Sequence, residues 1–214
     1  MQTGICKIYS LFLVNHSLGE NMSKAKTVSR KKIASGKWLS LEKISYVDHY
    51  GSRRDWECST RIRSRGAVAI IAILKPSGRI MLVRQFRPPS DGWTIEFPAG
   101  LIDRNEKPGT TARRELYEET GYSGKVTGVG RPLFSSPGMS GETVHLVRME
   151  IKENAPENRD VKTSFDDGEH LETFLVPLKE LMKFLEKSHR KGDRLDAKVV
   201  CFATGMNIQY IYKK

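Results

Sequence analysis

The apolar positions of the chain repeat at two spacings, which separate expected strands from expected helices. Residues 36–63 alternate apolar and polar side chains on both sides of a turn at 49–52, and this pattern predicts a β-hairpin. The run from Gly66 to Leu74 is almost wholly apolar, as a strand buried on both faces requires. Further strands are expected at 80–86, 124–134, 143–151 and 171–176.

Helical spacing occurs in three segments. Pro108 suits the first turn of a helix, Gly121 suits its end, and small or apolar side chains lie between them at four-residue steps. A second helix is expected after Pro177 with an apolar stripe, and a third after Asp196, which can cap it, to about Tyr210. Residues 153–168 are polar and aperiodic, which predicts a long exposed loop of the kind that often contacts substrate.

Length and composition indicate one globular domain with at most a small appendage. The chain has 214 residues, of which 38% are hydrophobic and 29% charged. No apolar run is long enough to span a bilayer, so no membrane partner is expected. The three cysteines are far apart and form neither a disulfide framework nor a zinc-binding pattern, which favours a cytoplasmic location.

The net charge of +11 is concentrated in the first third of the chain. Residues 1–65 hold 13 Lys and Arg against 5 Asp and Glu. Such an excess can attract anionic substrates or nucleic acid, but no helix-turn-helix or RNA-binding aromatic motif accompanies it. We therefore expect residues 1–34 to be a basic, disordered extension, with no nucleic-acid partner. Residues 1–21 precede Met22 and read either as extra upstream sequence or as part of that extension.

Acidic side chains crowd the first expected helix. Glu115 and Glu119 lie one turn apart, Glu118 lies beside them, and Glu106 approaches from the preceding loop. Like charges at this spacing repel each other unless a cation lies among them. Carboxylate oxygens are preferred by hard divalent ions, and Mg²⁺ completes its coordination with water and substrate phosphates. The segment therefore predicts a Mg²⁺ site.

The same segment resembles the signature of the Nudix hydrolases, G-x5-E-x7-R-E-U-x-E-E-x-G-U, where U is apolar or aromatic. Every defined position is matched, by Gly100, Glu106, Arg114, Glu115, Leu116, Glu118, Glu119, Gly121 and Tyr122. The resemblance implies an α+β fold, the α/β/α sandwich, and a metal-dependent attack of water on a nucleoside diphosphate linked to another group. It implies Mg²⁺ as the cofactor, with Mn²⁺ as an alternative.

A wider resemblance, over roughly residues 35–210, is to the ADP-sugar diphosphatase branch of this family, the ADP-ribose pyrophosphatases. The segments that carry it are 36–42, 54–57, 85–89, 95–103 and 167–169. It implies a homodimer in which an N-terminal antiparallel β element, residues 35–64, is exchanged between subunits, and a Nudix hydrolase domain at residues 65–214. The substrate would be ADP-ribose or a related ADP-sugar, cleaved to AMP and a sugar phosphate.

The resemblance also implies a substrate-binding set. Trp38 and Trp56 match tryptophans that stack on adenine, although each could instead be a core or dimer-interface aromatic residue. Arg61 and Arg87 are candidates to grip the diphosphate, and a surface ion pair is the alternative for each. Glu96 and Leu101 complete the expected set.

For the metal, we expect Glu115 and Glu119 as principal ligands, assisted by Glu96, Glu118 and the carbonyl of Ala99. Arg114 is expected to orient the glutamates by ion pairing. A late-loop glutamate is the general base in this branch, and Glu169 fits that position. The alternatives nearby are Glu118, Asp166 and Glu172.

Two other functions remain open from the sequence. The same chemistry could act on an oxidised purine nucleotide, on GDP-mannose or on an RNA 5′ end. A non-catalytic domain that senses ADP-ribose is the other reading, although sensors of this kind often lose signature glutamates, all of which are present here.

Overall fold

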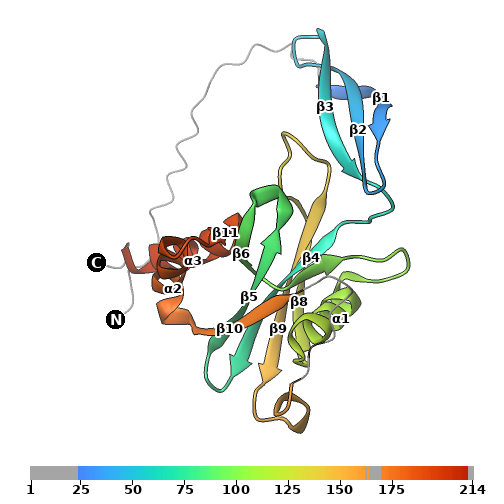
Figure 1. Cartoon of the computed structure of the whole chain (residues 1–214). Helices are drawn as coiled ribbons and strands as arrows, with labels where there is room; N and C mark the ends of the chain where they lie inside the picture. Colours follow the sequence, from blue (N-terminus) through green and yellow to red (C-terminus); the bar gives the residue numbers. More distant parts are fainter. Residues whose placement is uncertain (1–23, 162, 164–169, 212–214) are drawn as a thin grey trace, which may run out of the picture.

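The computed structural model describes residues 24–161, 163 and 170–211, with the side chains of 207–211 left out. An eight-stranded sheet forms the centre of the molecule, and a separate three-stranded sheet projects from one end of it (Figure 1). The projecting sheet has the order β1-β2-β3, with β1 at Lys26–Ser35, β2 at Leu39–Val47 and β3 at Arg53–Arg61.

The central sheet is mixed. Its main path runs β11-β6-β5-β4-β9-β8, while β10 pairs with β5 and β7 pairs with β4. β4 and β9 are parallel along their whole length, and β4 carries the apolar run that the sequence predicted as a buried strand. The strands are β4 (Ala67–Lys75), β5 (Arg79–Arg87), β6 (Gly92–Glu96), β7 (Ala99–Leu101), β8 (Lys125–Phe134), β9 (Thr143–Lys152), β10 (Leu171–Pro177) and β11 (Arg194–Leu195).

Helices cover both faces of this sheet. Because side chains alternate along a strand, β4 sends Val68 and Ile70 to one core and Ala69 to the other. The first core packs under α1 (Pro108–Thr120), and the second under α2 (Leu181–Arg190) and α3 (Ala197–Ile211) (Figure 1). The predicted α+β class and the α/β/α sandwich are confirmed. Across the described ranges, every helix is too short or too polar to cross a bilayer.

The helix ends follow the local signals in the sequence. Pro108 stands at the start of α1, and Gly121 ends it in the left-handed conformation, with φ of 73° and its N–H donated to the carbonyl of Tyr117. At α3 the carboxylate of Asp196 accepts the backbone N–H of Lys198 at 2.8 Å, so the predicted cap is present.

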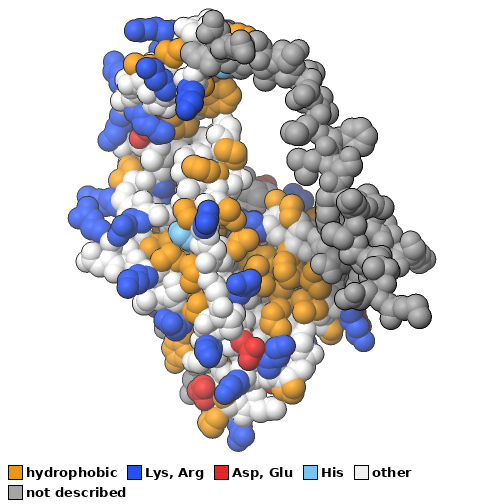
Figure 2. All heavy atoms as spheres, turned by 180° about the vertical axis from the view of Figure 1, so that it is seen from behind, with side chains coloured by type: hydrophobic (Ala, Val, Ile, Leu, Met, Phe, Trp, Pro, Cys, Tyr) orange, Lys and Arg blue, Asp and Glu red, His pale blue; other side chains and the backbone are white. Residues whose placement is uncertain are grey.

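The expectation of a disordered extension at residues 1–34 is wrong for the part that forms β1. This strand pairs antiparallel with β2 along its length, although all ten of its side chains are exposed. It holds its place through the backbone ladder and buries no apolar face, so its side-chain pattern gave no strand signal. Lys and Arg side chains gather over this sheet in the space-filling view (Figure 2). Residues 1–23 lie outside the described part of the chain.

The polar segment after β9 is more ordered than its composition indicated. It contains a 3-10 helix, η2 (Pro156–Asn158), and Asn158 is buried with 5% of its surface exposed. The side-chain amide of Asn158 accepts the Ser123 N–H at 2.8 Å and donates to the carbonyls of Ser123 and Lys152, both at 3.0 Å. These bonds fix the first part of the segment against the end of α1.

Candidate active site

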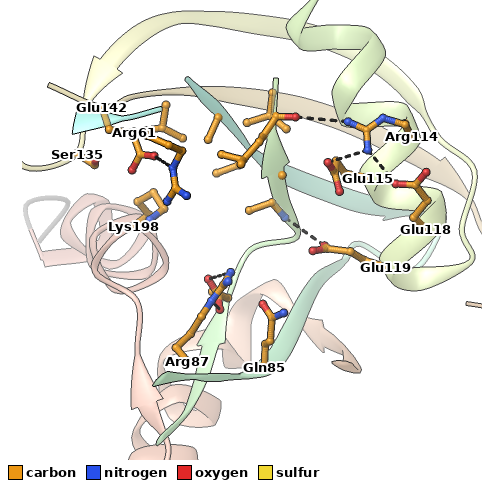
Figure 3. A pocket seen from close by; sticks show the side chains of 18 of the residues that line it. Arg61, Gln85, Arg87, Arg114, Glu115, Glu118, Glu119, Ser135, Glu142 and Lys198 are labelled. Carbon is orange, nitrogen blue, oxygen red and sulfur yellow. Dashed lines mark hydrogen bonds and ion pairs between the residues drawn. The ribbon is translucent and has the colours of Figure 1, made fainter. Parts of the chain in front are cut away.

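Many of the side chains that line a cavity of about 580 Å³ are charged. Its floor is made by β4, β5, β6 and β7 of the central sheet. One wall is α1, with Glu115, Glu118 and Glu119, and the other carries Arg61, Glu142 and Lys198 (Figure 3). An acidic wall thus faces a wall of mixed charge across the floor strands.

The acidic wall is anchored at its most buried member. Glu119 is 7% exposed on the last turn of α1, and its Oε2 accepts the backbone N–H of Ala99 at 3.1 Å. This bond joins the helix to β7. The expected ligand atom of Ala99 is its carbonyl, so its N–H is available for this bond with Glu119.

Arg114 joins the other glutamates. Its Nη1 lies 2.9 Å from Oε1 of Glu115 and donates to Oε2 of Glu118 at 2.9 Å. Its Nε and Nη2 donate hydrogen bonds to the two carboxylate oxygens of Glu106, at 3.1 and 3.0 Å. The guanidinium offsets the repulsion that these three carboxylates, two on α1 and one in the loop before it, would otherwise create.

The pairing of Arg114 with Glu106 shifts the pKa values of both side chains. The hydrogen bond from Arg114 lowers the pKa of Glu106, and the same bond to Glu106, with the charges of Glu115 and Glu118, raises the pKa of Arg114. Both groups stay ionised at neutral pH. Glu106 is therefore positioned to hold Arg114, and Arg114 to hold the carboxylates of α1.

The absence of a side chain at Gly100 makes room for Glu115. A Cβ built on Gly100 would lie 1.8 Å from Cδ and 1.9 Å from Oε1 of Glu115, closer than real Cβ atoms approach. Because the φ of Gly100 is outside the left-handed region, the constraint is steric and not a matter of backbone strain.

Replacing Gly100 by alanine is expected to displace the Glu115 carboxylate while the fold survives. Because the atoms met are the far end of the flexible Glu115 side chain, which can shift toward the cavity, the free energy of unfolding should fall by no more than about 1 kcal/mol, the low end for overpacking. Thermal unfolding and Mg²⁺ titration of G100A check this, with Gly138→Ala as the control, because a Cβ there meets no atom within 4 Å. Unaltered Mg²⁺ affinity in G100A would contradict the expected role of Glu115.

The donors at the acidic wall fit a divalent ion that keeps much of its own shell. Among the described residues, no group of three or more His, Cys, Asp or Glu side chains converges into a closed metal cage. Mg²⁺ seldom uses such a cage, since it binds through one or two carboxylates, waters and substrate phosphates. Glu115 and Glu119, facing an open polar cavity, have this character.

The opposite side of the cavity holds three cationic side chains, each paired with an acid. Arg87 donates from Nε and Nη2 to the two oxygens of Glu96 at 2.7 and 3.0 Å. Arg61 donates from Nε to Glu142 at 2.7 Å. The third, Lys198, lies 2.7 Å from Asp196. Fixed pairs of this kind orient the cationic groups before any ligand enters.

The two tryptophans lie away from this cavity. Trp56 donates its indole N–H to the carbonyl of Gly138 at 3.0 Å, and Trp38 is 66% exposed with the Lys37 ammonium 4.6 Å from its ring centroid. Neither is among the described residues that line the cavity, since Trp56 lies in the middle of β3 and Trp38 in the bend before β2, whereas Arg61 at the end of β3 reaches it. The expected adenine stacking by these side chains stays a prediction.

The candidate bases have different positions. Glu169 and Asp166 lie outside the described residues. Glu118 lines the cavity, whereas Glu172 forms an ion pair with Arg84 at 3.0 Å and is not among the lining residues. Leu101 and Ala99 both line the cavity beside α1.

Several lining residues were not among the sequence candidates. Gln85 and Asp103 stand in segments that carried the family resemblance, so their motifs could have drawn attention to them. Ser135 and Glu142 flank a turn whose path was not predictable from its composition. Nothing in the sequence marked Lys198 beyond its place after the capping Asp196. The missed residues are Gln85, Asp103, Ser135, Glu142 and Lys198.

Comparison with known proteins identifies the family and supports the fold. A family model described as "NUDIX domain" matches residues 63–196. The chain is 40% identical over 185 residues to a Saccharomyces cerevisiae protein named ADP-ribose pyrophosphatase, covering 82% of this chain and 80% of the relative. It is 34% identical over 194 residues to a Mus musculus protein named ADP-sugar pyrophosphatase, covering 87% of this chain and 88% of that protein. A crystal structure described as an ADP compounds hydrolase superposes with a TM-score of 0.66 at 19% identity, covering 92% of this chain and all of the other, and shows likeness of fold.

Proposed function

The chain belongs to the Nudix hydrolase family, and on this premise we propose that it hydrolyses the diphosphate linkage of ADP-ribose or related ADP-sugars. The products would be AMP and a sugar phosphate. The yeast and mouse relatives, named ADP-ribose pyrophosphatase and ADP-sugar pyrophosphatase, support this substrate class.

One observation carries the proposal. A single cavity presents the carboxylates of Glu115, Glu118 and Glu119 on one side and the cations of Arg61, Arg87 and Lys198 on the other. A diphosphate bound with divalent ions has two requirements. Its anionic oxygens require cationic hydrogen-bond donors, and the metal ions require carboxylate ligands. Both requirements are met by facing walls of the same cavity.

We propose Mg²⁺, with Mn²⁺ as a substitute, held by Glu115 and Glu119 with Glu96, Glu118 and the Ala99 carbonyl nearby. When bound, the ion supplies charge neutralisation at the phosphates and lowers the pKa of water. The side chains of the protein bind the substrate and orient its diphosphate. The pair with Glu96 fixes the plane of the Arg87 guanidinium at the cavity, and the planar fork of a guanidinium suits phosphate oxygens.

Arg114 acts in this proposal as a positioning residue. Its four bonds to Glu106, Glu115 and Glu118 hold the acids of α1 at the edge of the cavity. A carboxylate would accept the proton of the attacking water, and we propose Glu169 as this general base.

A homodimer is also proposed. The projecting sheet and the bend before β2 leave Trp38, Trp56, Leu39 and Leu41 exposed, between 39% and 66% of their surface, and a second copy could cover part of this apolar surface. In that arrangement a tryptophan could approach the partner's cavity and stack on adenine. We further propose a cytoplasmic location, which agrees with the free thiols of Cys58 and Cys201.

The function is tested by incubating the protein with ADP-ribose, ADP-glucose and GDP-mannose in Mg²⁺ and in EDTA, with the products identified. We expect AMP and ribose 5-phosphate from ADP-ribose, loss of turnover in EDTA, and its return when Mg²⁺ is restored. Hydrolysis of GDP-mannose in preference to both ADP-sugars would reject the substrate assignment. Turnover that survives EDTA would reject the metal.

A further inference from the structure

Lys198 projects into the cavity from the first turn of α3. Its backbone N–H is capped by Asp196, and its Nζ lies 2.7 Å from the other oxygen of the same carboxylate. The side chain is 35% exposed and lines the cavity on the side opposite the glutamates of α1 (Figure 3).

Local stability does not account for a lysine at this position. The N-terminus of a helix carries a partial positive charge, so a cation in the first turn is disfavoured and an acid is preferred. The pair with Asp196 offsets this only in part, since partly exposed ion pairs contribute little. A neutral side chain here would serve α3 as well or better.

The cavity supplies a reason for the charge. Metal ions at Glu115 and Glu119 would take the diphosphate oxygens that face α1. The remaining phosphate oxygens would face the opposite side, where Arg61, Arg87 and Lys198 lie. To these two guanidinium groups Lys198 adds a compact ammonium that has three donors and contacts the carboxylate of Asp196.

We propose that Lys198 is a substrate-binding residue that donates to the diphosphate oxygens turned away from the metal site. This deepens the proposed function and rests on it for the identity of the substrate. The ligand chemistry itself, an adenosine carrying a diphosphate, can be tested by binding alone.

The test is calorimetric titration of ADP and of adenosine in Mg²⁺ against wild type, Lys198→Met and Lys198→Arg. Lys183→Met, on the exposed face of α2, is the matched control. We expect Lys198→Met to weaken ADP binding about tenfold, the low end for a hydrogen bond to a charged group, with adenosine binding unchanged. Lys198→Arg should recover most of the loss, and Lys183→Met should bind as wild type.

Thermal unfolding distinguishes this from a structural role. Lys198→Met should unfold at the wild-type temperature or above it, because the unfavourable charge at the helix N-terminus is removed. In kinetics with ADP-ribose, its KM should rise about tenfold while kcat changes little.

Three results would overturn the proposal. They are ADP binding to Lys198→Met that matches wild type, an equal loss of ADP and adenosine binding, and no measurable ADP binding by the wild type. The proposed hydrolase function can be rejected independently of the role of Lys198. If wild type binds ADP through Lys198 but leaves ADP-ribose intact, this inference stands and the hydrolase assignment does not.

Discussion

Glu119→Gln is expected to reduce kcat for ADP-ribose by roughly a thousandfold or more, which corresponds to about 4 kcal/mol of lost transition-state stabilisation. The reason is the loss of one negative charge at the most buried carboxylate of α1, which we assign to the metal. An amide is a weak ligand for Mg²⁺ compared with a carboxylate. Turnover under saturating ADP-ribose at several Mg²⁺ concentrations measures the effect.

The fold of this variant should survive. Gln has nearly the volume of Glu, and its carbonyl oxygen can accept the Ala99 N–H that Glu119 accepts at 3.1 Å. We therefore expect an unfolding temperature close to that of wild type. Glu186→Gln removes the same charge from an exposed position on α2 and should leave both turnover and unfolding unchanged. Unchanged turnover in Glu119→Gln would remove Glu119 from the metal site.

Segments whose own residues dictate their structure were predictable. The apolar run at β4 is buried on both faces, and α1 begins at Pro108 and ends at Gly121 as the sequence indicated. In these places the burial pattern and the terminal signals agree, so one window of sequence is sufficient. The family signature then gave the arrangement of helices around the sheet.

Contacts between distant segments were not predictable from the sequence. Arg61 pairs with Glu142, 81 positions away, and Asn158 is fixed by the backbone of Ser123, 35 positions away. The partners in each case are polar residues from separate segments, so neither spacing nor hydropathy links them. β1 was missed for a related reason, since its stability comes from a backbone ladder that no side-chain pattern records.

The candidate site likewise has one part that was predictable from the sequence and one part that was not. Signature residues on one helix, Glu115, Glu118 and Glu119, line the cavity together because helical spacing brings them to one side of α1. The opposite wall is assembled from β3, the turn before β9, and α3, which are far apart in the sequence and lie together only in the fold. Lys198 is the clearest case, because its role depends on where the start of α3 comes to lie.

Glu169→Gln is expected to lower kcat for ADP-ribose by about 10²–10⁴-fold, the usual contribution of a general base, while KM changes little. The assignment comes from the sequence motif at 167–169, which lies outside the described residues. Because a carboxylate near Mg²⁺ keeps a low pKa, its effectiveness would come from its position relative to the water. The acidic limb of the pH profile of kcat should shift or disappear in the variant.

Glu118 and Glu172 provide the discriminating comparison. Glu118 lines the cavity but is held by Arg114 at 2.9 Å, and Glu172 is held by Arg84 at 3.0 Å with a side chain 45% exposed. Because a guanidinium engages each of these carboxylates, we expect Glu118→Gln and Glu172→Gln each to leave the acidic limb in place. If Glu118→Gln instead removes that limb and Glu169→Gln raises only KM, then the base belongs to α1. Arg114 would in that case have to release Glu118 before each turnover.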